Sequence, residues 1–347
     1  MRARTGLLVG LHIGFGLLVT CSSVRASVKP HRTGTARHSL QGPSLQGTAL
    51  PVASPEWLRG PGLVATLADG RVVDIVHFAG DAIHANLADE TGGTRTVILS
   101  PHDLVGMHWK EMRCANDSDG ICTEMAFRIT AAVRDDSSSL QQETEEPGDI
   151  WLYAVDYVAT DGEPADWTPA CGRGSSPDDS SEMGLFVDGS WDGDGSWRSD
   201  GYTFSCPRGV IAKCARAWGY RPWQTRESPE HGPVDLQPLH LACTRAARAE
   251  YCGDGVSYTE EGVLIDLFDI YGFNRREPVA GFTEESTWDE LGAITVHHAR
   301  VPGLYPTQCP TPARTQKTSR ETSRTTLIHV WSAPLPEAST VHFRDDD

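Results

Sequence analysis

A chain of 347 residues and 37.7 kDa is long enough to bury a sizeable core, and 39% hydrophobic residues with ten Trp and nine Phe exclude a disordered chain. The formal net charge of −17 argues against nucleic acid as the main partner, because a phosphate backbone attracts positive charge. The 34 Gly and 22 Pro indicate many turns and short elements rather than long helices.

Residues 1–26 have the pattern of a signal peptide. A basic start is followed by a largely apolar stretch from Gly6 to Val19, which suits a signal core and is short for a membrane-spanning helix. We expect cleavage after Ala26. In the alternative interpretation, Leu18-Val19-Thr20-Cys21 is a bacterial lipobox and Cys21 carries lipid. No other stretch approaches eighteen apolar residues, so we expect no second membrane-spanning segment. The signal pattern predicts an extracytoplasmic protein: secreted, periplasmic, or attached to the outer membrane through that lipid alone.

Residues 27–54 are rich in Ser, Thr, Pro and Gly, the composition of a solvated tether. Within them a period of five places Leu40, Leu45 and Leu50 in Ser-Leu-Gln-Gly-like units. Two and a half units are too few to stack as a solenoid, which needs about three repeats. We therefore predict a flexible Leu-Gln-Gly tether.

Residues 55–160 predict a β-rich part. Leu63 to Leu67 and Arg71 to Val76 flank Asp69-Gly70, a dipeptide favoured in hairpin turns. Runs rich in apolar and β-branched residues predict further strands. These strands are Thr94 to Leu99, Met125 to Val133 and Ile150 to Val158.

Residues 161–309 predict a second part with two short helices. The first runs from Pro207 to Trp218 and has Pro in its first turn, with a glycine just past its end. The second runs from about Pro238 to Cys252 and stops at Gly253.

Residues 310–347 predict an exposed tail with a last strand at Thr326 to Trp331. The fold class predicted is therefore α+β: a β-rich N-terminal part, followed by a disulfide-stapled α+β part with two short helices.

The cysteines support the export interpretation. Setting Cys21 aside leaves eight, and an even number in an exported chain predicts four disulfides. Cys114 and Cys122 flank the turn-forming string Asn116 to Gly120, so we expect them to clip the base of a hairpin. The eight are Cys114, Cys122, Cys171, Cys206, Cys214, Cys243, Cys252 and Cys309.

Helix geometry removes some of the other pairings. Nine helical residues between Cys243 and Cys252 rise about 13 Å, whereas a disulfide needs Cα atoms within about 7 Å. The same argument disfavours a bridge within the first predicted helix. Bridges between the two helices, and from them to Cys171 and Cys309, remain open. Zinc binding is disfavoured because no Cys-x-x-Cys spacing occurs.

Asp188-Gly189-Ser190-Trp191-Asp192-Gly193 predicts a candidate calcium loop. Asp188, Ser190 and Asp192 offer alternate oxygen ligands, and a sixth-position glycine lets them converge on one hard cation. The twelfth position holds Ser199 instead of a bidentate Glu. An acidic, glycine-rich turn is the alternative interpretation, and Ca²⁺ is the cofactor that this string suggests.

A group of carboxylates in the C-terminal part could supply the pair that glycoside hydrolysis needs, two carboxyl groups about 5–9 Å apart across a cleft. The group is Asp266, Asp269, Glu284, Glu285, Asp289 and Glu290. Asp266 and Asp269, three apart at the end of a strand, are instead expected to be solvated or to cap a turn. No serine-hydrolase, zinc-protease or phosphate-loop motif occurs, so no catalytic residue is assigned.

His240 begins the second predicted helix. We favour a hydrogen-bonded structural role over a general base, because Glu250 would lie too far round the helix to orient the imidazole. Arg245 and Arg248 follow on the same helix, and we expect them to pair with acidic groups on the protein's own surface.

Five aromatic residues fall within a short segment. Packing beneath the disulfide-rich loops is the favoured interpretation, and stacking on sugars or on a protein partner is the alternative. They are Trp191, Trp197, Trp218, Tyr220 and Trp223.

Several strings then appear in a characteristic order. They are Phe204 to Cys214, Trp218 to Trp223, His240 to Arg245, Arg248 to Gly255, Gly262 to Asp269 and Trp288 to Ala293. This order resembles the ADYC-domain family of exported bacterial proteins over about residues 151–300. The name-giving Ala-Asp-Tyr-Cys stands here as Ala249-Glu250-Tyr251-Cys252, and Cys309 is the candidate substitute for a family cysteine absent after Gly292-Ala293. The resemblance implies a fold and an envelope location, and no particular reaction.

We therefore expect an exported, non-catalytic binding or surface module whose partner is an envelope glycan or a protein. The alternative is a carboxylate-dependent hydrolase of envelope or extracellular polymers, and a third interpretation is a structural envelope protein. The first predicts saturable binding without product, the second predicts turnover that is lost on carboxylate substitution, and the third predicts neither.

Overall fold

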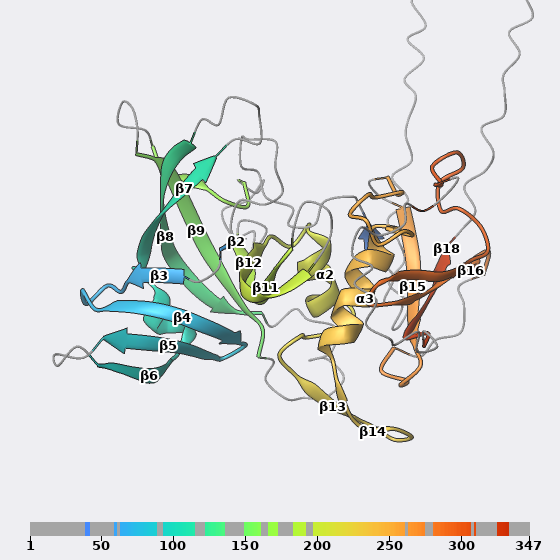
Figure 1. Cartoon of the computed structure of the whole chain (residues 1–347), viewed down its shortest axis with the longest axis horizontal. Helices are drawn as coiled ribbons and strands as arrows, with labels where there is room; N and C mark the ends of the chain where they lie inside the picture. The colour runs from blue at the N-terminus through green and yellow to red at the C-terminus, as the bar shows by residue number, and fades with distance from the viewer. Residues whose placement is uncertain are drawn as a thin grey trace, which may run out of the picture. The chain divides into compact units, whose positions relative to one another are not determined.

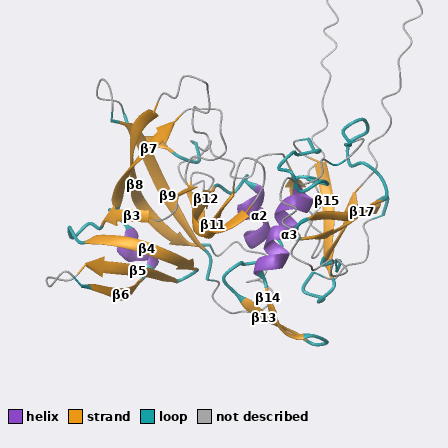
Figure 2. Ribbon diagram, in the orientation of Figure 1, coloured by secondary structure: helices purple, strands orange, loops and turns teal. Residues whose placement is uncertain are grey.

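A computed structural model of the chain describes residues 39–41, 59–60, 63–88, 93–114, 122–135, 149–160, 166–172, 183–191, 197–260, 263–274, 280–306, 309 and 325–332. All of them belong to one compact unit, residues 37–347. They are mostly β, with two α-helices in the described part of the chain (Figures 1 and 2). The predicted signal peptide and Cys21 lie outside the described residues.

The larger of the sheets includes most of the strands before residue 206. These are β2 (Arg59–Gly60), β3 (Leu63–Thr66), β4 (Val72–Ala79), β5 (Ala82–Ala88), β6 (Thr94–Leu99), β7 (His108–Cys114), β8 (Cys122–Arg134), β9 (Trp151–Ala159), β10 (Thr168–Pro169), β11 (Met183–Trp191) and β12 (Trp197–Ser205). Their order is β2-β12-β11-β9-β8-β7-β3-β4-β5-β6, with β10 paired to β9 (Figure 1). A 3-10 helix, η1 (Pro101–Leu104), lies between β6 and β7.

The predicted strands of this part are confirmed. β3 and β4 pair antiparallel with Leu63 opposite Ile75, and Gly70 takes the left-handed conformation (φ 88°) that the turn between them requires. β6, β8 and β9 coincide with the other three predicted strands. Cys114 and Cys122 are paired residues at the end of the β7–β8 pair where the connecting loop joins the strands, as expected for the hairpin, but their side chains lie outside the described residues.

The large sheet folds back on itself, so that β4 contacts β11. Phe78 stacks on Phe186 with ring centroids 4.8 Å apart, and the buried Tyr202 and Phe204 complete an aromatic core. Alternation of buried and exposed residues along each strand supplies this core, because successive side chains point to opposite faces.

A second sheet has the order β1-β15-β18-β16-β17. Its strands are β1 (Ser39–Gln41), β15 (Val263–Asp269), β16 (Thr283–Asp289), β17 (Gly292–Val296) and β18 (Ile328–Ser332). β18 confirms the predicted last strand. β1 corrects the prediction of a uniformly flexible tether, because Ser39 pairs with Ile265 at the sheet edge; the rest of residues 27–54 lies outside the described residues.

The two helices are α2 (Val210–Arg216) and α3 (Gln237–Ala247), and a two-stranded hairpin of β13 (Thr225–Ser228) and β14 (Gly232–Asp235) lies between them in the chain. Both helices contribute to a hydrophobic core shared with Leu185 and Val187 of β11 and with Ile265 and Trp288 of the second sheet. No helix in the described part of the chain combines the length and apolar character needed to cross a membrane.

Both predicted helices are longer than the observed ones. α2 begins at Val210 rather than Pro207, because the preceding residues form a turn in which the Gly209 N–H donates to the Cys206 carbonyl at 2.8 Å. α3 ends at Ala247 rather than Cys252. The cause of this early end lies in the cluster described below.

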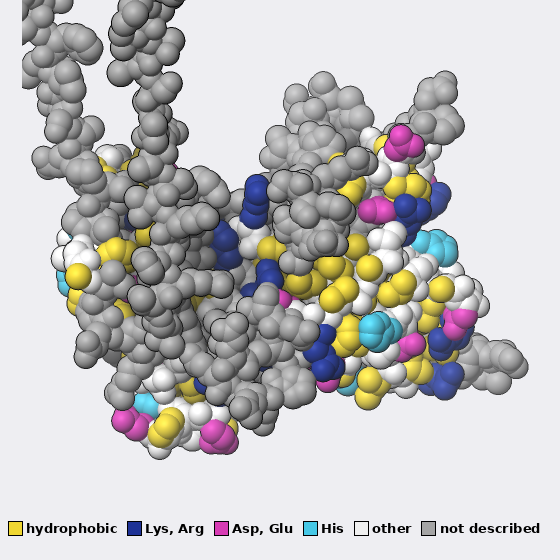
Figure 3. All heavy atoms as spheres, turned by 180° about the vertical axis from the view of Figure 1, so that it is seen from behind, with side chains coloured by type: hydrophobic (Ala, Val, Ile, Leu, Met, Phe, Trp, Pro, Cys, Tyr) yellow, Lys and Arg dark blue, Asp and Glu magenta, His cyan; other side chains and the backbone are white. Residues whose placement is uncertain are grey.

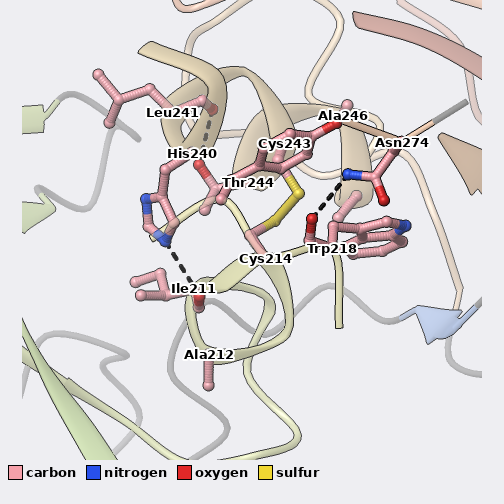
Figure 4. The surroundings of a disulfide bond; sticks show 12 residues. Ile211, Ala212, Cys214, Trp218, His240, Leu241, Cys243, Thr244, Ala246 and Asn274 are labelled. Atoms are coloured by element: carbon pink, nitrogen blue, oxygen red, sulfur yellow. Dashed lines mark hydrogen bonds between the residues drawn. A yellow bond between two sulfur atoms is a disulfide. The ribbon is translucent and has the colours of Figure 1, made fainter. Parts of the chain in front are cut away.

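Of the four predicted disulfides, three join residues that the structure describes, and they staple this part of the molecule. Cys214 of α2 is bonded to Cys243 of α3, which is one of the helix-to-helix bridges left open by the sequence (Figure 4). The other two join the chain just outside the helices to distant segments, as expected. They are Cys171–Cys206 and Cys252–Cys309.

Candidate functional site

The chain reverses direction just after α3, and this reversal brings buried charged side chains together. Ala249 has a left-handed backbone (φ 51°), which is unusual for a residue with a side chain. The Tyr258 N–H then donates to the Arg248 carbonyl at 3.1 Å, so the returning segment lies against the helix end. The sequence suggested that Glu250 lies on the helix. Glu250 instead follows the helix end and faces back toward the helix.

The Glu250 carboxylate is completely buried and joins two arginines of the helix end. Arg245 Nη1 donates to Glu250 Oε1, Arg248 Nη1 donates to Oε2 at 2.6 Å, and the Gly255 N–H donates to Oε1 at 3.0 Å. Burial raises the pKa of Glu250, and the two guanidinium groups oppose that rise. The expectation that Arg245 and Arg248 pair with surface acids was therefore wrong, since their acid is in the interior.

A second ion pair, between Arg300 and Glu285, lies at the same helix end. Arg300, whose side chain is 0% exposed, donates to Glu285 through Nε at 2.9 Å and through Nη2 at 3.0 Å. The same guanidinium donates to the carbonyls of Ala246 at 2.7 Å and Ala247 at 2.8 Å. A cation at these carbonyls satisfies acceptors that a continuing helix would have used, and it complements the negative end of the helix dipole. α3 therefore ends there.

Tyr251 connects the two halves of the cluster. Its hydroxyl donates to Glu285 Oε1 at 3.1 Å and accepts the Arg300 N–H at 3.0 Å, and its ring stacks on Trp288 at 5.6 Å. Burial, reinforced by the Glu285 charge, raises the pKa of Tyr251, so the hydroxyl keeps its proton. We call this group the buried ionic cluster. It consists of Arg245, Arg248, Glu250, Tyr251, Glu285 and Arg300.

The structure does not place the six predicted carboxylates as a catalytic pair. Asp269 accepts the Tyr220 hydroxyl at 2.9 Å and three backbone N–H groups, which confirms the turn-capping interpretation for it. Glu285 belongs to the buried ionic cluster, Asp289 accepts the Leu291 N–H at 2.8 Å, and Glu284 bonds to His329 at 2.6 Å. Asp266 is buried at 1% exposure, whereas Glu290 contributes its carbonyl to Arg245.

The structure places the first residue of the predicted calcium loop in a strand. Asp188 lies in β11, where its Oδ1 accepts the Phe78 N–H at 2.6 Å and its Oδ2 bonds to His77 Nδ1. A β-bulge separates it from Ser190, whose side chain, like Asp192, lies outside the described residues. Among the residues that the structure describes, no three His, Cys, Asp or Glu side chains are grouped to hold a metal ion.

His240 has the structural role expected for it. The ring is 2% exposed and its Nε2 bonds to the Ile211 carbonyl at 3.1 Å, so it joins α3 to α2 beside the Cys214–Cys243 disulfide (Figure 4). Burial lowers its pKa to about 4. The neutral imidazole therefore uses its N–H on the Ile211 carbonyl, which ties α3 to α2.

The aromatic segment is packed rather than displayed. Trp218 and Tyr220 are 0% exposed, and Trp191 is 3% exposed. Trp197 and Trp223 are partly buried against the same core, and Trp223 Nε1 donates to Asp149 at 2.5 Å. Packing beneath the stapled part, the favoured interpretation, is confirmed.

A hollow of about 510 Å³ lies on β7 and β8, and sequence reasoning missed it. Its side-chain wall consists of residues such as Lys110 and Arg128, which alternate with the buried Trp109 and Phe127, so it opens on the face away from the core. Trp167, from the segment before β10, closes one side. We call it the β7–β8 hollow. Its lining is Val105, Gly106, His108, Trp109, Lys110, Ala126, Phe127, Arg128, Ile129, Thr130 and Trp167.

Charged groups are held at the wall of the β7–β8 hollow. The Arg128 guanidinium lies over the Trp167 ring at 4.3 Å and donates to Asp156 at 2.9 Å. Lys110 bonds to Glu124 at 2.8 Å and holds the pKa of that carboxyl below its usual value. Figure 3 shows hydrophobic and basic side chains intermixed on one described face of the molecule. Trp167 is one of six tryptophans outside the aromatic segment, and no signal in its neighbouring residues distinguishes it from the others.

These observations define a mostly β, disulfide-bonded protein with a buried ionic cluster at the end of its second helix. The family model of the ADYC domain matches residues 101–302, which is more than half of the chain, and the chain belongs to this family. The match begins with η1 and includes β7 to β9, so it extends further toward the N-terminus than the strings that suggested it. No curated protein and no solved structure matches the chain.

The family's name-giving string is the centre of the buried ionic cluster. Ala249 reverses the chain, Glu250 receives two guanidinium groups, Tyr251 joins the second ion pair, and Cys252 forms the disulfide to Cys309. Each of the four residues therefore has a separate structural task. Both carboxylates of the cluster have no exposed side-chain surface, and each is bonded to arginine.

Proposed function

We propose that this protein is an exported, non-catalytic binding module that holds an envelope glycan in the β7–β8 hollow. The observation that carries the proposal is the contrast between the carboxylates and the hollow. The carboxylates suggested for hydrolysis do not line it, while a tryptophan, an arginine and a lysine do. Its volume lies in the range of about 300–1,000 Å³ usual for small-molecule sites.

A glycan fits the chemistry of this hollow. Sugars present apolar C–H faces that pack on aromatic rings, and hydroxyl groups that bond to charged side chains. Trp167 supplies the ring. The Arg128–Asp156 and Lys110–Glu124 pairs supply donors and acceptors side by side, without the large net charge that would favour an ionic ligand.

Export is supported by the three disulfides, because disulfides persist in oxidising compartments and are rare in the cytosol. We propose that the leader at residues 1–26 directs it, and that the mature protein is secreted, periplasmic or lipid-anchored through Cys21. Cell fractionation followed by mass spectrometry of the mature N-terminus tests this. An N-terminus at Ser27 would support the free form, diacylglyceryl-Cys21 the anchored form, and an intact N-terminus in the cytoplasm would overturn export.

The binding proposal is tested by titrating the oxidised protein with envelope oligosaccharides and measuring melting temperature and calorimetric heat. A ligand at a hundred times its dissociation constant stabilises the folded state by about 2.7 kcal/mol, which a melting curve resolves. We expect Trp167→Ala and Lys110→Ala to weaken binding at least tenfold. Trp331→Ala, at a half-buried tryptophan of the other sheet, is the matched control and should bind normally.

Equal binding by Trp167→Ala and the unsubstituted protein would remove the β7–β8 hollow from the proposal. A panel with no binding at millimolar concentration would contradict the glycan class. Product analysis in the same samples addresses the hydrolase alternative, since release of shorter oligosaccharides that depends on a carboxylate would replace a binding module by an enzyme.

A further inference from the structure

Two histidines face each other across the β4–β5 hairpin, away from the buried aromatic core. His77 of β4 and His84 of β5 are direct cross-strand partners, with ring centroids 5.4 Å apart and ring planes inclined by 46°. The neighbouring Phe78 and Ile83 are buried at 4% and 0% exposure. A β-bulge in β4 between Ile75 and His77 sets this register. The two imidazoles therefore lie on the solvent side of the hairpin.

Asp188 fixes the orientation and tautomer of one of these rings. Its carboxylate reaches across from β11, with Oδ1 held by the Phe78 N–H at 2.6 Å and Oδ2 bonded to His77 Nδ1. An ionised carboxylate can only accept, so Nδ1 must carry the proton. The lone pair of His77 is then on Nε2, which is the form that binds a metal ion.

A local device holds Asp188 in place. β11 has a β-bulge between Asp188 and Ser190, and Gly189 takes the left-handed conformation there (φ 84°). A side chain at Gly189 would meet the Trp197 ring at 2.2 Å, so only glycine fits. The carboxylate is thus positioned by backbone shape, and not by its contact with His77 alone.

The spacing of the rings is that of two imidazoles on one ion. Nitrogen atoms about 2.0–2.1 Å from a tetrahedral ion place the two ring centroids about 5 Å apart. A carboxylate on the second nitrogen of a metal-bound histidine is the usual partner that orients it. The His84 imidazole has no hydrogen-bond partner among the described residues, and the residue is only partly buried.

We propose that His77 and His84 form a binding site for a transition-metal ion of the zinc or copper type, and that Asp188 orients His77 for it. Imidazole pairs favour these ions over calcium, which prefers oxygen ligands. Since no three metal-binding side chains are grouped in the described part of the chain, water or a donor from another molecule takes the remaining positions. This site is independent of the β7–β8 hollow.

Isothermal titration of the metal-free, oxidised protein with Zn²⁺ and with Cu²⁺ tests the proposal. We expect one site per chain that loses at least tenfold in affinity in His84→Gln, and ten- to a hundredfold in Asp188→Asn. His329→Gln is the matched control, because His329 is also a half-exposed strand histidine bonded to a carboxylate, Glu284, and should bind as the unsubstituted protein does. Melting curves of the metal-free variants show whether each remains folded.

Nuclear magnetic resonance of the unsubstituted protein gives a test that requires no substitution. One equivalent of Cu²⁺ should broaden the ring signals of His77 and His84 before those of the other histidines. Unchanged affinity in His84→Gln, or first broadening at His297 and His329, would overturn the proposal. Calcium binding that Asp188→Asn abolishes would also overturn it, because the carboxylate would then be a ligand itself.

Discussion

The buried ionic cluster and the His77–Asp188 pair join ionisable side chains from distant parts of the chain, but they use them in opposite ways. In the cluster, Glu285 and Arg300 have no exposed side-chain surface, and the guanidinium groups are used on carboxylates and on helix-end carbonyls. At the hairpin, His77 is 44% exposed and Asp188 27%, and one imidazole nitrogen keeps its lone pair.

This difference separates the side chains that stabilise the fold from the side chains that can bind a ligand. Buried charges are tolerated only when they are fully paired. The residues Ala249 to Cys252 therefore serve to hold the end of α3 and the chain reversal. Half-exposed groups contribute little to the free energy of folding, and one that keeps an unused lone pair can bind a ligand. Ligands are therefore expected at the large sheet rather than at the string that names the family.

The largest expected effect is the loss of one buried partner. Glu285→Gln removes the charge that compensates Arg300, and breaking a buried pair in this way costs about 3–5 kcal/mol. Urea unfolding followed by tryptophan fluorescence measures it. Asp188→Asn is the comparison at the half-exposed pair, where we expect about 1 kcal/mol or less. Equal losses at both places would remove the distinction between the two regions.

The disulfide between the helices has a comparable effect. Cys214→Ala with Cys243→Ala frees a loop with a sequence separation of 29, which in the chain-entropy description costs about 3–4 kcal/mol. Guanidinium unfolding of the double variant gives the value.

Cys214 and Cys243 are both fully buried, whereas Cys309 is exposed. Mild reductant should therefore open Cys252–Cys309 first, and alkylation of Cys214 before Cys252 would contradict the order.

Local sequence patterns were sufficient for much of the fold. The strand-forming runs at β3, β4, β6, β8 and β9 and the Asp69-Gly70 turn depend on neighbouring residues, and the structure agrees with them. Of the four disulfides that the even cysteine count predicts, three join described residues. Helix rise disfavoured pairings within each helix and left a bridge between the helices open, and Cys214–Cys243 is such a bridge. These features can be predicted without knowing the contacts to residues that are distant in the sequence.

The candidate sites depend on partners far away in the chain. α3 ends early because Arg300, more than fifty residues later, takes the carbonyls of Ala246 and Ala247, although the local sequence suits a longer helix. His77 and Asp188 are separated by 111 residues, and nothing in either segment indicates the other. The same limit hid Trp167, whose contact is Arg128 in β8. Such pairings become visible only when the strand order is known.

Acidification should distinguish the buried histidine from the exposed ones. The pKa of His240 falls from 6.5 to about 4 on folding, so the unfolded chain binds more protons between these values. The contribution is complete above pH 6.5 and is lost as the pH falls toward 4, by about 3 kcal/mol in total. Stability of His240→Gln, which keeps a donor for Ile211, should depend less on pH over this window. The exposed His102→Gln should follow the unsubstituted protein, and identical profiles for all three would contradict the assignment.

The smallest effect concerns the departure from the family string. Glu250→Asp restores the family's residue but shortens the side chain by one methylene, and the carboxylate must still reach Arg245, Arg248 and the Gly255 N–H together. Weakening one charged hydrogen bond costs about 1–2 kcal/mol, which appears as a lower urea midpoint with an unchanged slope. Glu227→Asp, at an exposed position of β13, is the control and should leave the midpoint unchanged. If Glu250→Asp instead raised the midpoint, the cluster would be one that accommodates glutamate under strain, and full pairing of the buried charges would no longer distinguish it from the half-exposed pair.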